Sequence, residues 1–161
     1  MQQTFNLRNF MMSDLERVKY INHLCLPENY TDNFFVDLHR RFPETFIVAE
    51  EDKEVVGYIM CRIETGLSII DFHGLIKKGH IVSVAVLPEY RRKGLGQALV
   101  NEAMENMKLY KAKQCYLEVR KSNMPAIDLY KNLGFKISRT IRGYYADGED
   151  AYLMIKDISS D

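Results

Sequence analysis

Residues 91–96, Arg-Arg-Lys-Gly-Leu-Gly, are the segment of this sequence best suited to bind a charged ligand. They follow an apolar run at residues 80–87 and precede residues 96–107, where apolar side chains recur with helical spacing. A helix that begins after a glycine-rich turn offers backbone N–H groups and its positive dipole end to an anion. We therefore predict a polyanion-binding loop, with a phosphate or pyrophosphate as ligand.

The glycine spacing narrows the choice of polyanion. A P-loop needs Ser or Thr after a Gly-Lys pair, and no such triplet occurs in this sequence. A dinucleotide fingerprint needs a third glycine at the position that Leu99 occupies. The run matches Q/R-x-x-G-x-G/A instead, and so resembles the acyl-coenzyme A pyrophosphate loop of the GNAT acetyltransferase superfamily. We call residues 91–96 the donor loop. A solvated basic turn is the alternative interpretation.

Three further segments make this resemblance more specific. Residues 122–135 are similar to the GNAT pattern S-N-x-x-A-I-x-L-Y-x-x-x-G-F. Residues 26–30, Leu-Pro-Glu-Asn-Tyr, resemble the substrate loop of protein amino-terminal acetyltransferases. Residues 143–151, Gly-Tyr-Tyr-Ala-Asp-Gly-Glu-Asp-Ala, resemble the hairpin that closes over the substrate in those enzymes. The resemblance is to their catalytic subunits, especially the archaeal single-chain form and the catalytic subunit of the eukaryotic NatA complex.

The resemblance implies that acetyl-coenzyme A is the acetyl donor and coenzyme A the product, without a metal. The backbone of residues 84–86 would pair with the pantetheine arm, and an N–H at or next to Val86 would polarise the acetyl carbonyl. Asn123 would reach the coenzyme near the departing sulfur, and its position also suits a plain helix N-cap. The implied coenzyme-binding residues are Val84, Ala85, Val86, Arg91, Arg92, Lys93, Gly94, Leu95, Gly96, Asn123 and Tyr130.

The resemblance also implies three catalytic residues. Tyr130 would return a proton to the coenzyme sulfur, although a tyrosine on an apolar helix face commonly serves core packing. His80 and Glu118 fall on positions that related enzymes use for the base. An α-amino group has a reference pKa of about 7.7–8.0, so a base acting through ordered water would suffice. The alternatives are an ion pair of Glu118 with Arg120 and a polar strand start at His80.

The acceptor side depends on residue 28. Relatives with Glu at this position favour the small first residues that methionine removal exposes, which implies Ser, Ala, Thr or Gly amino termini. Met-Leu starts are a broader alternative. The implied substrate-binding residues are Leu26, Pro27, Glu28, Tyr30, Tyr144 and Tyr145.

Three other activities compete with direct transfer to protein amino termini. A ping-pong route would use Cys61 or Cys115 as an acylated intermediate, but the sequence shows no matching His-and-acid arrangement. A small-molecule or lysine amine acetyltransferase of the same fold is the second alternative. The third is a non-catalytic coenzyme-binding subunit of an acetyltransferase complex.

The elements that position these residues alternate between strands and helices. We expect strands at residues 4–10, 45–50, 55–64, 80–87, 112–120, 135–141 and 151–155, and helices at 14–24, 31–41, 95–107 and 123–133. A capping box at residues 13–16 would begin the first helix, and residues 74–79 would be a polar connection. This order predicts one mixed α/β domain of α+β type over residues 1–161. The resemblance implies a GNAT fold, with about seven strands, about four helices and a splayed strand pair for acetyl-coenzyme A.

Composition limits the class of protein. The sequence has 161 residues, and 22 basic and 22 acidic side chains balance, which argues against DNA binding driven by bulk charge. Three scattered cysteines predict reduced, buried thiols and no zinc site. No apolar run approaches the length of a membrane span and no signal-peptide pattern is present, so we expect a cytoplasmic protein. The expected partners are acetyl-coenzyme A and protein amino termini, with the ribosome or an auxiliary subunit as further candidates.

Overall fold

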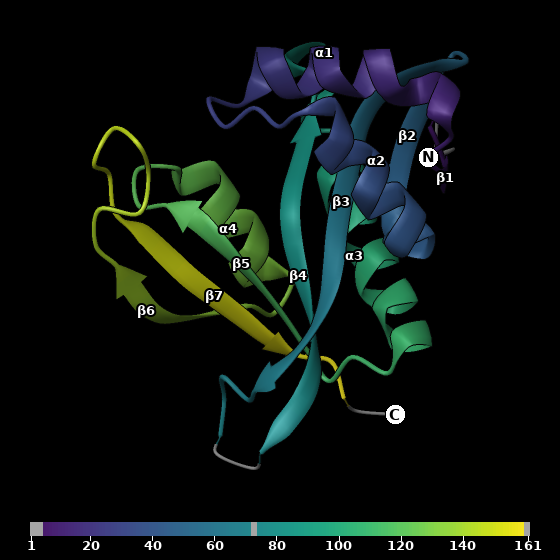
Figure 1. Ribbon diagram of the computed structural model, residues 1–161. Helices are drawn as coiled ribbons and strands as arrows, with labels where there is room; N and C mark the ends of the chain where they lie inside the picture. Colours follow the sequence, from purple (N-terminus) through teal and green to yellow (C-terminus); the bar gives the residue numbers. More distant parts are fainter. Residues whose placement is uncertain (1–4, 72–73, 160–161) are drawn as a thin grey trace. The chain divides into compact units, whose positions relative to one another are not determined.

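A computed structural model describes residues 5–71 and 74–159 of the chain. Within these residues the strands form one sheet in the order β1-β2-β3-β4-β5-β7-β6, accompanied by four α-helices (Figure 1). This mixed sheet confirms the predicted fold class. The chain divides into two compact units, here called unit 1 (residues up to Arg62, with Ile81–Met107) and unit 2 (Ile63–His80, with residues from Lys108 onward).

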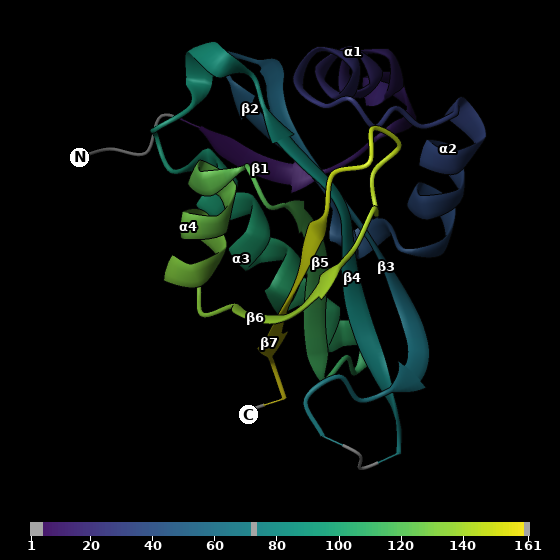
Figure 2. The same cartoon turned by 90° about the vertical axis from the view of Figure 1, so that its left-hand side faces the viewer.

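Unit 1 holds the first strands and three helices. Its elements are β1 (Asn6–Asn9), α1 (Leu15–Cys25), α2 (Asp32–Arg41), β2 (Phe46–Glu51), most of β3 (Glu54–Leu67), the end of β4 (Leu75–Val86) and α3 (Leu95–Met107). Four consecutive β2 residues, Phe46 to Ala49, are at most 1% exposed. Because successive strand side chains point to opposite faces, both faces of β2 are covered. Figures 1 and 2 show α1 and α2 on one face of these strands and α3 on the other.

The helix starts in unit 1 confirm one sequence signal and correct another. Thr31 caps α2, because its side chain accepts a hydrogen bond from the Phe34 amide at 3.2 Å. The capping box predicted at residues 13–16 is wrong. Asp14 is the N-cap of α1 and makes no side-chain cap bond to that helix. Its carboxylate instead accepts hydrogen bonds from Arg8, at 2.8 and 2.9 Å, and from the Met11 amide.

Unit 2 is built around β5. Its elements include β5 (Gln114–Arg120), α4 (Met124–Asn132), β6 (Lys136–Ile141) and β7 (Ala151–Asp157). β7 lies between β5 and β6 and is antiparallel to both (Figure 2). Along β5, Cys115, Leu117 and Val119 are buried, whereas the residues between them are partly exposed. Strand alternation therefore puts Glu118 on the face opposite Leu117 and Val119.

Two strand boundaries differ from the prediction by three residues or more. β4 begins at Leu75, so the polar connection expected at residues 74–79 is wrong. Two lysines in this stretch led to the prediction of a polar connection in place of a strand. The strand depends on non-local pairing, because Lys78, Gly79 and His80 pair in parallel with residues 114–116 of β5. β3 likewise continues to Leu67, beyond the predicted residue 64. The β4–β5 register covers residues 78–80 of β4, and the splay expected at residues 84–86 stays a prediction. The prediction for the first strand began at Thr4, which lies outside the described residues.

No helix in the described part of the chain has the length and apolar character required to span a bilayer.

Candidate active site

The donor loop in unit 1 adopts the backbone shape that its glycines suggest. Gly94 has φ +85°, and Arg92 also has a positive φ, of +65°. Helix α3 starts directly after Gly94, and the first bond into its backbone runs from the Ala98 amide to the Gly94 carbonyl at 3.0 Å. A Cβ atom at Gly94 would meet no heavy atom within 4 Å, so this turn faces open space. Leu95 is 1% exposed, which leaves only its backbone for a ligand.

Two basic side chains of the donor loop, those of Arg91 and Lys93, have protein partners. Arg91 donates from Nε to the Val86 carbonyl at 2.9 Å and so fastens the loop to the end of β4. Lys93 Nζ lies 3.4 Å from a carboxylate oxygen of Glu51, and 5.3 Å from the centre of the Tyr90 ring. Residues 91–94 are exposed. The loop thus has a defined shape, and pyrophosphate binding there stays a prediction.

Gly57 is a feature of unit 1 that the sequence reasoning missed. A Cβ atom at this position would lie 3.1 Å from the Ala85 carbonyl oxygen and 3.2 Å from Val86 Cγ2. Such distances are too short for a side chain without a shift of the neighbouring atoms. Glycine therefore lets β3 approach β4 at residues 84–86, where the coenzyme arm is predicted to pair.

The loop that carries Glu28 is held by a buried polar network. Asn22 donates from Nδ2 to the Glu28 carbonyl and to the Tyr58 hydroxyl, both at 3.1 Å. A hydrogen bond of 2.6 Å joins the Tyr58 hydroxyl to Ser83 Oγ. Asn22, Tyr58 and Ser83 are at most 5% exposed. The Tyr30 hydroxyl adds a bond to the Val82 carbonyl at 3.3 Å, so the loop is attached to β4 at two neighbouring residues.

In unit 2 the structure brings together the two predicted bases. His80 Nε2 and Glu118 Oε1 form a hydrogen bond of 2.7 Å, and their side chains are 7% and 15% exposed. A carboxylate between apolar neighbours in a strand is costly unless it is paired, and the imidazole supplies that pairing. Arg120, the alternative partner of Glu118, forms ion pairs with Asp147 and Glu149.

Tyr116 belongs to the same group, although the sequence reasoning gave it no role. Its ring stacks on the His80 imidazole, with centroids 4.5 Å apart and an angle of 8° between the planes. Its hydroxyl donates to Glu64, and Lys78 Nζ lies 5.5 Å from its ring centre. The stacked ring restricts rotation of the imidazole. Strand alternation, which puts residue 116 on the face of residue 118, was the signal that could have identified it.

Helix α4 carries the residues predicted at the leaving-group end. Asn123 caps this helix, because its Oδ1 accepts a hydrogen bond from the Ala126 amide at 3.3 Å, as the plain reading of the sequence expected. Tyr130 is 7% exposed and packs near Phe135, with ring centroids 5.8 Å apart. Burial raises the pKa of the Tyr130 hydroxyl, so it keeps its proton through the neutral range. Coenzyme contacts of both residues stay predictions.

The cysteines are unsuited to a covalent route. Cys61 and Cys115 are buried, and Cys25 is half-buried. Burial raises the pKa of both the Cys115 and the Cys25 thiols, which disfavours the nucleophilic thiolate. Among residues 5–71 and 74–159, no three His, Cys, Asp or Glu side chains are grouped so as to hold a metal ion.

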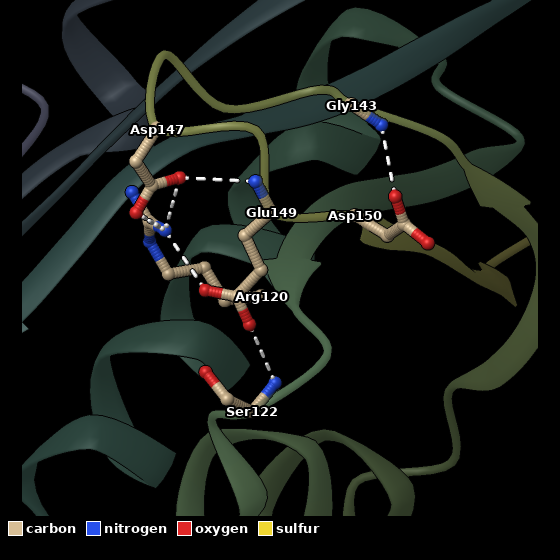
Figure 3. Close-up of polar contacts among 6 residues, drawn as sticks. All are labelled: Arg120, Ser122, Gly143, Asp147, Glu149 and Asp150. Atoms are coloured by element: carbon tan, nitrogen blue, oxygen red, sulfur yellow. Dashed lines mark hydrogen bonds and ion pairs between the residues drawn. The ribbon is translucent and has the colours of Figure 1, made fainter.

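Tyr144 and Tyr145, predicted to contact the acceptor, lie in the loop between β6 and β7. Their rings meet edge to face at 4.9 Å, and Tyr144 is 47% exposed. Arg120 lies over the Tyr145 ring, 4.0 Å from its centre. It also binds Asp147 and Glu149 of the same loop (Figure 3). We call residues 142–150 the acceptor hairpin.

Comparison with known proteins assigns this arrangement to a family. Residues 10–135 match the family described as "Acetyltransferase (GNAT) family". The N-alpha-acetyltransferase of Sulfurisphaera tokodaii is 54% identical over 93% of this chain and 91% of its own length. The structure of Ard1 from Thermoplasma volcanium is similar, with a TM-score of 0.84, 32% identity, and coverage of 96% of this chain and 97% of that one.

A further similar structure contains acetyl-CoA. Arabidopsis thaliana NAA60, determined in complex with acetyl-CoA, is similar with a TM-score of 0.85 and 27% identity. The match covers 96% of this chain and 99% of that one. The family match spans most of the chain, and the relatives cover it almost completely. The chain therefore belongs to the acetyltransferase (GNAT) family, as one of its N-alpha-acetyltransferases.

Proposed function

We propose that this enzyme acetylates the α-amino groups of proteins that begin with a small residue, namely Ser, Ala, Thr or Gly. The amine attacks acetyl-coenzyme A directly, without an acylated enzyme. The observation that carries the chemical part of this proposal is the His80–Glu118 hydrogen bond of 2.7 Å. It forms a shielded acid–base pair from the two residues predicted as the base, on the face of β5 opposite Leu117 and Val119.

The acid–base pair suits an α-amino acceptor. A protein α-amino group has a reference pKa of about 7.7–8.0, whereas that of lysine is about 10.4, so an α-amine gives up its proton more readily at neutral pH. Glu118 orients the imidazole of His80, and Tyr116 limits its rotation. We assign the pair the removal of the amine proton through an ordered water. Tyr130, which keeps its proton, is assigned the return of a proton to the departing sulfur.

The donor loop fits a pyrophosphate by its shape and surroundings. A turn with positive φ at Arg92 and Gly94 leads into the N-terminus of α3, and its open side is free of neighbouring heavy atoms at Gly94. Backbone N–H groups at such a helix start bind anions. We assign residues 91–96 to the pyrophosphate, the backbone of residues 84–86 to the pantetheine arm, and Asn123 to the thiol end. The amide at Val86 would polarise the acetyl carbonyl.

The choice of direct attack predicts that the enzyme works without its cysteines. The variant Cys25→Ala/Cys61→Ala/Cys115→Ala is expected to keep kcat within about threefold of the wild type, because no thiol is acylated. Thermal unfolding should be measured alongside, since two of these thiols are buried. If the triple variant does not fold, the three single Cys→Ala variants are measured in its place. A folded variant that has lost the chemical step would contradict direct attack.

The acceptor preference is tested with a peptide library that differs only in residues one and two. The wild type is expected to prefer Ser, Ala, Thr and Gly starts. Glu28→Val should shift the kcat/KM ratio of Met-Leu to Ser starts upward by about tenfold, because an apolar wall favours the larger apolar side chain. Glu102→Val, an exposed change of the same type on α3, is the matched control. An unchanged ratio in Glu28→Val would contradict the role of residue 28. Binding to an auxiliary subunit or to the ribosome stays a prediction from the resemblance.

A further inference from the structure

Arg120 of β5 contacts the acceptor hairpin at several points. Arg120 is the last residue of β5, and its side chain is 18% exposed. From Nη1 it donates to both Asp147 oxygens, at 3.1 and 2.9 Å, and to Glu149 Oε1 at 2.9 Å. Its guanidinium also lies 4.0 Å from the centre of the Tyr145 ring. Figure 3 shows Arg120 bound to both Asp147 and Glu149. The same cation also stacks on the Tyr145 ring.

The acceptor hairpin carries three acidic residues, and two cations pair with them: Arg120 with Asp147 and Glu149, and Lys121 with Asp150 at 3.7 Å. Asp147, Glu149 and Asp150 follow one another closely, and their like charges repel one another when no cation balances them. Hydrogen bonds from Ser122, followed by one from Arg120, lower the pKa of Glu149 to about 2, so this carboxylate is charged at neutral pH. Arg120 therefore binds a Glu149 carboxylate that is negatively charged at neutral pH.

The same contacts connect the hairpin to the start of α4. The second oxygen of Glu149 accepts a hydrogen bond from the Ser122 amide at 2.9 Å. Ser122 directly precedes Asn123, the N-cap of α4. Within the hairpin, the Tyr145 amide donates to the Glu149 carbonyl at 3.1 Å, and the Gly148 amide donates to the Tyr145 carbonyl at 2.8 Å. The tyrosine backbone and the two carboxylates thus form one hydrogen-bonded piece, which Arg120 attaches to β5.

We propose that Arg120 is a positioning residue for the acceptor peptide: it holds the acceptor hairpin in place and thereby sets the position of the Tyr145 hydroxyl. This inference rests on the proposed function, in which Tyr144 and Tyr145 bind the peptide backbone. Lysine would serve this role poorly, because it lacks the planar guanidinium that stacks on a ring while it donates several hydrogen bonds. Arg120 touches no reacting atom in this assignment and acts through Tyr145.

The first test separates peptide binding from chemistry. Arg120→Gln is expected to raise the KM for a Ser-starting peptide by about tenfold, while kcat at saturating peptide changes by less than about threefold. The dissociation constant for acetyl-coenzyme A, measured without peptide, should stay within about twofold of the wild type. Arg139→Gln, which removes an exposed arginine on β6 of the same unit, is the matched control and should leave all three values unchanged.

The second test asks whether Arg120 acts through Tyr145. Tyr145→Phe keeps the ring under the guanidinium and removes only the hydroxyl. In this background Arg120→Gln should raise the peptide KM by less than about twofold, since the hydroxyl that it positions is already gone. Full additivity of the two changes would overturn the inference, and so would an unchanged peptide KM in folded Arg120→Gln.

Folding and the underlying function are checked separately. Thermal unfolding shows whether Arg120→Gln is folded. Where it is not, Arg120→Lys replaces it as the test variant, because lysine keeps the positive charge and most of the aliphatic side chain. Arg120→Lys should still raise the peptide KM. An unchanged KM in folded Arg120→Lys would then overturn the inference. A wild type that acetylates no peptide would contradict the proposed function itself, whereas an active wild type with a normal Arg120→Gln variant contradicts only the role of Arg120.

Discussion

Replacing Glu118 by Gln is expected to lower kcat by about a hundredfold with a much smaller change in the peptide KM, because general acid–base catalysis contributes about 10² to 10⁴ in rate. Glutamine keeps the shape of the side chain and can still hydrogen-bond His80, so the change removes mainly the negative charge beside the imidazole. His80→Ala is expected to have an effect of similar size. The double variant should be little slower than the slower single variant, since the two residues act as a pair.

These values are obtained from initial rates at varied peptide concentration, with acetyl-coenzyme A saturating. Glu102→Gln on the exposed face of α3 is the matched control for removal of a carboxylate. Equal effects that fall only on KM would show that His80 and Glu118 position the substrate without moving a proton. Independent, multiplicative effects of the two changes would show that their hydrogen bond has no catalytic importance.

Changing Gly94 to Ala is expected to raise the dissociation constant for acetyl-coenzyme A by about tenfold or more, because a side chain at φ +85° strains the backbone by about 1–2 kcal/mol. The donor loop would relieve that strain by turning the backbone N–H groups at the start of α3 away from their present directions. Binding of acetyl-coenzyme A is measured by calorimetry without peptide.

Gly74 offers a matched control for this change. It has φ +91°, and a Cβ atom there would meet no heavy atom within 4 Å, as at Gly94. Gly74→Ala therefore imposes the same kind of strain away from the donor loop, and should leave the dissociation constant unchanged. Equal weakening in the two variants would mean that the loss follows general destabilisation, and would contradict the assignment of the donor loop.

The sequence predicted the helices well because their signals are local. Thr31 and Asn123 both act as the caps that their residue types suggest, and Gly134 at the end of α4 has a positive φ. Strand β4 was partly missed because its residues 78–80 pair with β5, more than thirty positions away in the chain. At Asp14, Arg8 and the Met11 amide offered the carboxylate better partners than the predicted helix cap.

The site was predictable residue by residue but not as a set of contacts. Strand alternation assigned a face to Glu118, whereas its bond to His80 follows from the parallel register of His80 with Tyr116. The network of Asn22, Tyr58 and Ser83 joins residues from three separate elements, and no spacing in the chain links them. Contacts of this kind depend on tertiary packing, which local patterns do not contain.

That network also has a consequence for how substrate choice can change. Asn22 donates its hydrogen bond to the main-chain carbonyl of residue 28. This hydrogen bond does not depend on which side chain residue 28 carries. The backbone carbonyl of residue 28 thus holds the loop conformation, whereas its side chain is assigned the selection of the acceptor. A single substitution at position 28 can therefore alter which amino termini are accepted while the backbone bond persists, and evolution or a designer can exchange acceptor preference without rebuilding the loop.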